Sequence, residues 1–151
     1  MKCDKAYGQF GLLGLRVVLG IVFLYHGYDK VFVKGIPAIT GFMNGLGLPA
    51  PELMAYLVSY GELIGGALMI LGLLTFWVSV DFTIIALVAL FTVHISKGFS
   101  AMQGGYEYIL LILAASFFML THGAGKYSLD VFMLGCDECN HECKNGTCEV
   151  K

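Results

Sequence analysis

The sequence predicts an all-α integral membrane protein: a four-transmembrane-helix bundle with a short interfacial helix in the first loop and a cysteine-rich C-terminal tail. Hydrophobic residues make up 58% of the 151 residues and charged residues only 13%. Because a soluble domain carries about 25% charged residues, this chain has too few to cover a globular surface in water. The lipid bilayer is therefore the predicted partner of its apolar faces. The net charge of -2 and the lack of a basic block argue against a nucleic-acid partner.

Four apolar runs are each long enough to cross a bilayer, which takes about 20 residues of helix. None of them alternates with a period of two, and a helix satisfies its own backbone hydrogen bonds in lipid. The predicted spans are residues 10–28, 53–76, 77–95 and 106–122. The first run has no small-residue cleavage site at its end, so we expect a membrane helix there rather than a removable signal peptide.

The connections between the spans follow from helix length and from proline. One helix through the second and third runs would be about 60 Å long, twice the hydrocarbon thickness, so a tight turn is predicted at residues 74–77. Trp77 would then anchor the chain at the interface. The longest connection, residues 31–51, contains the predicted interfacial helix at 37–43, which has Pro37 in its first turn. Lysines are nearly balanced on the two sides, so charge alone does not orient the bundle.

Four segments resemble the DoxX family of small membrane proteins. They are Arg16-x3-Gly20-x2-Phe23-x2-His26-Gly27-x2-Lys30-x-Phe32, Glu62-x2-Gly65-Gly66-x5-Gly72, His94-x3-Gly98-Phe99 leading to Gly104-Gly105-Tyr106-Glu107-Tyr108, and Gly123-x-Gly125-Lys126-Tyr127-Ser128-Leu129-Asp130. The resemblance implies a multi-pass bundle in the cell membrane, residues 1–130, with both ends in the cytoplasm. The chain departs from the family at Ala124, where proline is common, and in the cysteine-rich extramembrane tail, residues 131–151.

The family takes its name from a subunit of a thiosulfate:quinone oxidoreductase. The resemblance therefore implies a membrane subunit associated with redox chemistry, at most one subunit of an oxidoreductase and linked to quinone. The alternative is a non-enzymatic membrane scaffold or chaperone-like assembly factor; a small-solute carrier is disfavoured because no internal repeat is evident. We expect a protein partner or a homo-oligomer. The spans contain no cysteine, so a partner or a tail-bound metal would carry the electrons.

Ionisable side chains in the spans are the candidate ligand-binding residues, because such groups are costly in lipid and usually face the protein interior. They are His26, Lys30, Glu62, His94 and Glu107. Four of them share a depth near the non-terminal side, and Glu62 lies near the middle of its span. An imidazole or lysine can hydrogen-bond a quinone carbonyl, and a carboxylate can move its proton. The alternative is that Lys30 and Glu107 are ordinary interfacial groups.

Arg16 and Glu62 are solitary charges in two apolar spans, and we expect them to form a structural ion pair that fixes helix packing. On the second span, Gly61 and Gly65 form a pair of small residues that would allow close approach of another helix. Asp81 is interpreted as a residue near a span end that reaches the interface.

Four cysteines and one histidine are concentrated in the tail, which is too short and polar to form a core without a cross-link. They are Cys136, Cys139, Cys143, Cys148 and His141. Four thiolates can hold zinc tetrahedrally, with the histidine as a reserve ligand. Two disulfides in an oxidising compartment and a disordered, reduced tail remain the alternatives.

Overall fold

The computed structural model describes the backbone of residues 6–134 and the side chains of residues 8–132. All regular secondary structure in this part of the chain is helical, and it contains no strand. Its helices are α1 (Ala6–Tyr28), continued by a π-helix (Asp29–Lys34), α2 (Ile36–Gly45), α3 (Pro51–Leu71), α4 (Thr75–Ala89), continued by a π-helix (Leu90–His94) and a 3-10 turn (Ile95–Lys97), a second 3-10 turn (Ala101–Gln103), α5 (Glu107–His122) and α6 (Leu129–Leu134).

Three helical stretches within the described residues are long and apolar enough to cross a membrane. They are Gly8–Lys34, Pro51–Leu71 and Thr75–Lys97, of 27, 21 and 23 residues. The fourth predicted span corresponds to α5, an apolar helix of 16 residues. The α-helical character of all four predicted segments is thus confirmed, and three have the length that a span requires.

The turn between α3 and α4 lies slightly earlier than predicted. Gly72 ends α3 in the left-handed conformation, at a φ of 68°, and Leu74 adopts a φ of 53° before α4 begins at Thr75. Glycine takes this conformation without steric cost, which favours the stop at Gly72. Trp77 therefore lies in the first turn of α4, where it is 69% exposed.

The structure confirms the two helix starts that proline predicted. Pro37 lies in the first turn of α2, which covers the predicted residues 37–43, and Pro51 is the first residue of α3. Proline suits a helix start because its missing N–H would have no partner there.

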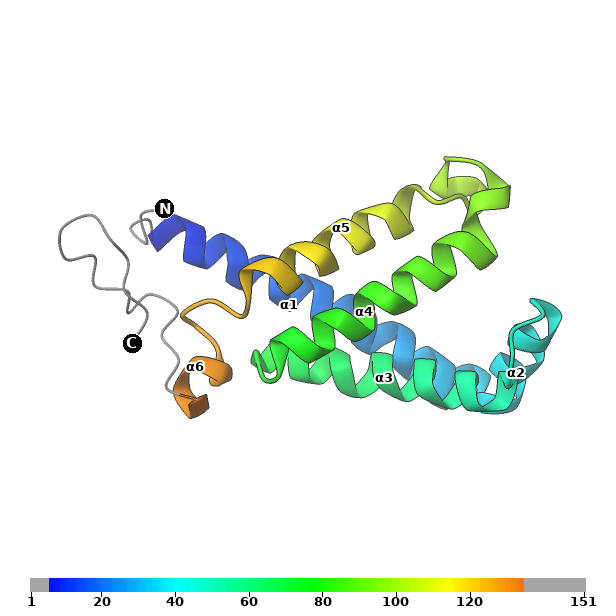
Figure 1. Cartoon of the computed structure of the whole chain (residues 1–151), viewed down its shortest axis with the longest axis horizontal. Helices are drawn as coiled ribbons and strands as arrows, with labels where there is room; N and C mark the ends of the chain where they lie inside the picture. Colours follow the sequence, from blue (N-terminus) through cyan, green and yellow to red (C-terminus); the bar gives the residue numbers. More distant parts are fainter. Residues whose placement is uncertain (1–5, 135–151) are drawn as a thin grey trace.

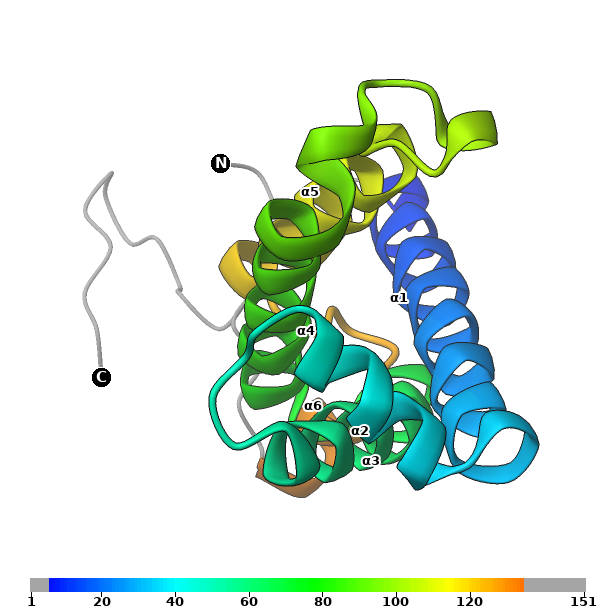
Figure 2. The ribbon, with the colours of Figure 1, turned by 90° about the vertical axis from the view of Figure 1, so that its right-hand side faces the viewer.

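The helices pack mainly as two antiparallel pairs, α1 with α3 and α4 with α5, and α2 packs on α3 (Figure 1). The beginning of α1 and the short α6 lie at one end of the molecule. Toward the other end, the α4–α5 pair diverges from the α1–α3 pair, and α2 lies beside the beginning of α3 (Figures 1 and 2). The rings of Phe23 and Phe82 stack in the core between α1 and α4, with centroids 3.5 Å apart.

Glycines determine how closely the helices approach. A Cβ on Gly27 would collide with the backbone of Leu63, and a Cβ on Gly66 would collide with that of Leu24, so α1 and α3 touch backbone to backbone. Gly61 and Gly65, the pair expected to serve a close helix contact, face α4, where they leave room for Asp81 and Phe82. The small residues of α3 therefore serve two neighbours on two faces.

Candidate functional site

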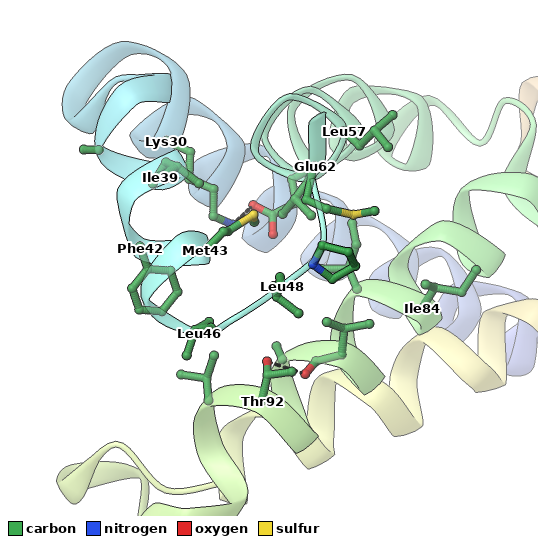
Figure 3. Close-up of a pocket in the computed structure, with 18 of the residues that line it drawn as sticks. Lys30, Ile39, Phe42, Met43, Leu46, Leu48, Leu57, Glu62, Ile84 and Thr92 are labelled. Atoms are coloured by element: carbon green, nitrogen blue, oxygen red, sulfur yellow. Dashed lines mark hydrogen bonds and ion pairs between the residues drawn. The ribbon is translucent and has the colours of Figure 1, made fainter. Parts of the chain in front are cut away.

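A pocket of about 690 Å³ lies between α2, α3 and α4. This volume is within the usual range of small-molecule sites. The walls are mostly aliphatic and aromatic, with side chains from all three helices (Figure 3). Examples are Ile39, Phe42, Met43, Leu57, Ile84 and Val88. Four charged residues also line it: Lys30, Lys34, Glu62 and Asp81.

An ion pair between Lys30 and Glu62 lies at the wall of this pocket, where the two side chains point toward each other (Figure 3). Glu62 is only 4% exposed. A buried carboxylate is strongly destabilising without a partner, and the Lys30 ammonium supplies one. The close approach at Gly27 makes this pairing feasible, because it presses α1 against the backbone of Glu62 and Leu63 just before the chain reaches Lys30.

Asp81 brings a second carboxylate to the pocket from α4. It is partly buried, and its Oδ2 lies 3.0 Å from where a Cβ on Gly61 would be. No hydrogen bond or ion pair joins its side chain to another described residue. Asp81 lies six residues after the start of α4, about 9 Å along the helix, and its side chain lines the pocket in addition to being near a span end.

The structure brings together two of the five expected ligand-binding residues, Lys30 and Glu62. His26 is exposed on α1 and lies against the ring of Tyr25. It precedes Gly27 by one residue, so its side chain points about 100° away from the contact with α3. It is not among the residues that line the pocket.

His94 and Glu107 serve the connection between α4 and α5 instead of the pocket. The Nδ1 atom of His94 lies 2.8 Å from the carbonyl oxygen of Gly104, and the Glu107 carboxylate accepts a hydrogen bond of 3.0 Å from the Ala101 N–H. Both side chains thus contact backbone groups of the segment between α4 and α5. The expected single cavity with His26, Lys30, His94 and Glu107 around it is therefore replaced by one bounded by α2, α3 and α4.

The expected ion pair between Arg16 and Glu62 is also corrected. Arg16 is 2% exposed and donates hydrogen bonds of 2.6 Å to the carbonyl oxygens of Ala124 and Tyr127. Its guanidinium lies against Gly72, ten residues beyond Glu62 on α3 and thus about 15 Å further along the helix. Arg16 and Glu62 therefore lie at different depths in the bundle, and each contacts polar groups at its own depth.

The predicted metal ligands Cys136, Cys139, Cys143, Cys148 and His141 lie outside the described residues. Within the described residues, no group of three or more histidine, cysteine or acidic side chains could hold a metal ion. The zinc hypothesis for the tail stays a prediction.

Comparison of the sequence with known proteins shows its family. The sequence model of the DoxX family matches residues 11–95, and the chain belongs to this family. A Bacillus subtilis protein with the name "Putative oxidoreductase CatD" is 35% identical over 125 residues, 83% of this chain and 88% of that protein. No solved structure matches the chain.

Two further relatives extend over most of the chain. An uncharacterised membrane protein of Mycobacterium tuberculosis is 29% identical over 83% of this chain and 82% of its own length. A Haemophilus influenzae protein without an assigned function is 30% identical over 83% of this chain and 92% of its own length. Family membership together with the long apolar helices establishes that this is a membrane protein.

Proposed function

We propose that this chain is the membrane subunit of a redox system and that it binds a quinone in the pocket between α2, α3 and α4. The observation that carries the proposal is the Lys30–Glu62 ion pair at the wall of an otherwise apolar pocket. Binding sites for small ligands combine apolar walls with a few placed polar groups, and a quinone has an apolar ring and tail with two carbonyl acceptors. The oxidoreductase name of the Bacillus subtilis relative supports the redox association.

The Lys30 ammonium is the group that would hydrogen-bond a quinone carbonyl. It has three donor hydrogens, of which the contact with Glu62 uses one. Glu62 holds the ammonium in place at the wall of the pocket. The carboxylates of Glu62 and Asp81 are the groups that would exchange protons with the bound ring, while a partner protein would carry the electrons, since zinc has no redox chemistry.

The pocket also suits a ligand that arrives from the bilayer. Leu57, Ile84 and Val88 line the pocket. Leu57 and Ile84 are more than half exposed, and Val88 is 44% exposed. In a membrane these apolar surfaces of α3 and α4 would meet lipid rather than water. A lipid-soluble molecule could then reach Lys30 sideways between the two helices, without crossing the aqueous phase.

The proposal includes four crossings with α2 at the interface and both termini in the cytoplasm. This topology is supported by the position of α6, which lies at the same end of the molecule as the beginning of α1 (Figure 1). The 16 residues of α5 extend about 24 Å, somewhat less than the hydrocarbon thickness of about 30 Å. A short span is accommodated by local bilayer thinning and by interfacial side chains such as Tyr108 and His122 at its ends.

The test is direct binding of a short-chain benzoquinone to the full chain in lipid nanodiscs, by isothermal titration calorimetry. We expect Lys30→Gln to weaken binding by about tenfold or more, as for loss of one charged hydrogen bond. Lys126→Gln is the matched control, because Lys126 lies exposed at the opposite end of the bundle, and its one hydrogen bond within the described residues is made by its backbone N–H, toward Gln9. Absence of quinone binding by the wild-type protein would overturn the proposal and favour the scaffold alternative.

A further inference from the structure

Among the described residues, one charged side chain at the pocket has no partner of opposite charge. Lys30 is paired with Glu62, and Lys34 forms an ion pair of 2.6 Å with Asp29. Both lysines at the pocket wall therefore already have a carboxylate partner. Asp81 lines the same pocket and has no hydrogen-bond or ion-pair partner among the described residues. A carboxylate in an apolar environment is costly unless a donor satisfies it.

Gly61 determines where this carboxylate lies. Asp81 Oδ2 is within 3.0 Å of the position that a Cβ on residue 61 would take, and the next residue on α3 is Glu62. One turn further along α3, Gly65 accommodates the ring of Phe82 in the same way. Two adjacent side chains of α4 are thus set against two glycines of α3, which fixes the rotation of α4 and holds Asp81 at the pocket wall.

We infer that Asp81 is a specificity-determining residue of the pocket, and that it makes the site prefer the reduced, hydroxyl-bearing quinol over the oxidised quinone. This inference rests on the proposed function. A quinol hydroxyl donates a hydrogen bond to the free Asp81 carboxylate, while its oxygen atoms still accept from the Lys30 ammonium. A quinone has only carbonyl acceptors. One carbonyl can accept a hydrogen bond from Lys30, but neither can donate one to Asp81, so the carboxylate is left facing another acceptor.

The experiment compares the affinities of a short-chain benzoquinone and its chemically reduced quinol for the full chain in nanodiscs, under anaerobic conditions. We expect the wild-type protein to bind the quinol about tenfold or more tightly than the quinone, as for one charged hydrogen bond. Asp81→Asn should bring the ratio of the two affinities close to one, because the amide is a weaker acceptor and can donate to a carbonyl. Glu52→Gln is the matched control, since Glu52 is exposed and does not line the pocket.

A second variant tests the position of the carboxylate without changing any charge. Gly61→Ala adds a methyl group where Asp81 Oδ2 now lies close, so the carboxylate must shift and the affinity ratio should fall. Size-exclusion profiles and quinone affinity show that each variant is folded. Equal affinity of the wild-type protein for both redox forms, or an unchanged ratio in Asp81→Asn, overturns this inference and leaves quinone binding standing. Failure of the wild-type protein to bind either form overturns the proposed function and the inference together.

Discussion

The carboxylate of Asp130 accepts a hydrogen bond of 2.6 Å from the backbone N–H of Leu74, 56 positions earlier in the chain. Its other oxygen accepts a bond of 2.9 Å from the N–H of Thr75, and its own N–H donates to the carbonyl oxygen of Gly72. The segment after α5 thus returns to the turn between α3 and α4. It satisfies the first N–H groups of α4, which no residue of the helix itself can do.

Loss of this contact should destabilise the bundle. We expect Asp130→Ala to lower the free energy of unfolding by about 1–2 kcal/mol, the usual cost of removing a helix N-terminal cap. Asp130→Asn retains one acceptor oxygen and should cost less. Thermal unfolding in a mild detergent gives the order of the three proteins. Equal stability of Asp130→Ala and the wild type would show that the contact contributes nothing.

Double-mutant cycles should show that Arg16 and Glu62, the two buried charges expected from the sequence to form an ion pair, are not coupled energetically. Arg16 and Glu62 have different partners, so the losses from Arg16→Gln and Glu62→Gln should add within about 0.5 kcal/mol. The cycle of Lys30→Gln with Glu62→Gln should show coupling of about 1 kcal/mol or more, because either single change leaves a buried charge without its partner. Chemical denaturation of each variant in detergent supplies the free energies. Coupling in the Arg16 cycle that matches the Lys30 cycle would contradict the structure.

Gly27→Ala should separate α1 from α3. The added methyl group would collide with the backbone of Leu63, which cannot move aside as a flexible side chain can. Overpacking of this kind costs about 1–3 kcal/mol. Gly14→Ala on the same helix is the control, because no atom lies within 4 Å of the new methyl group, and alanine should there preserve or raise stability. A lower melting temperature for the control than for Gly27→Ala would refute the close contact.

The tail should bind about one equivalent of zinc through Cys136, Cys139, Cys143 and Cys148 if it lies in a reducing compartment. Thiolates are strong zinc ligands, and metal binding would fold a segment that is too short and polar to form a core without a cross-link. Metal analysis of protein purified without chelator measures the stoichiometry, which should fall to zero when Cys136 and Cys139 are both changed to serine. A metal-free tail in which every thiol reacts freely would leave the disulfide-free, disordered alternative.

The sequence by itself determined the helical class, the membrane environment and most helix boundaries. These properties depend on residues that are near in the chain: runs of apolar side chains, and Pro37 and Pro51 at helix starts. Hydrophobicity and backbone preference act locally, so periodicity and composition are sufficient to predict them. The resemblance to the DoxX family had the same local origin, in four short segments of sequence.

Only the tertiary structure decided which charges meet. Lys30, rather than Arg16, pairs with Glu62, and Asp81 lines the same pocket without joining the pair, because the glycines of α1 and α3 set the depth and rotation at which the helices pack. A solitary charge in an apolar span indicates that a partner is needed, but the sequence does not show which residue that partner is. That choice depends on the relative positions of three helices, and a displacement of a few turns along the helix axis, about 5.4 Å each, exchanges one partner for another.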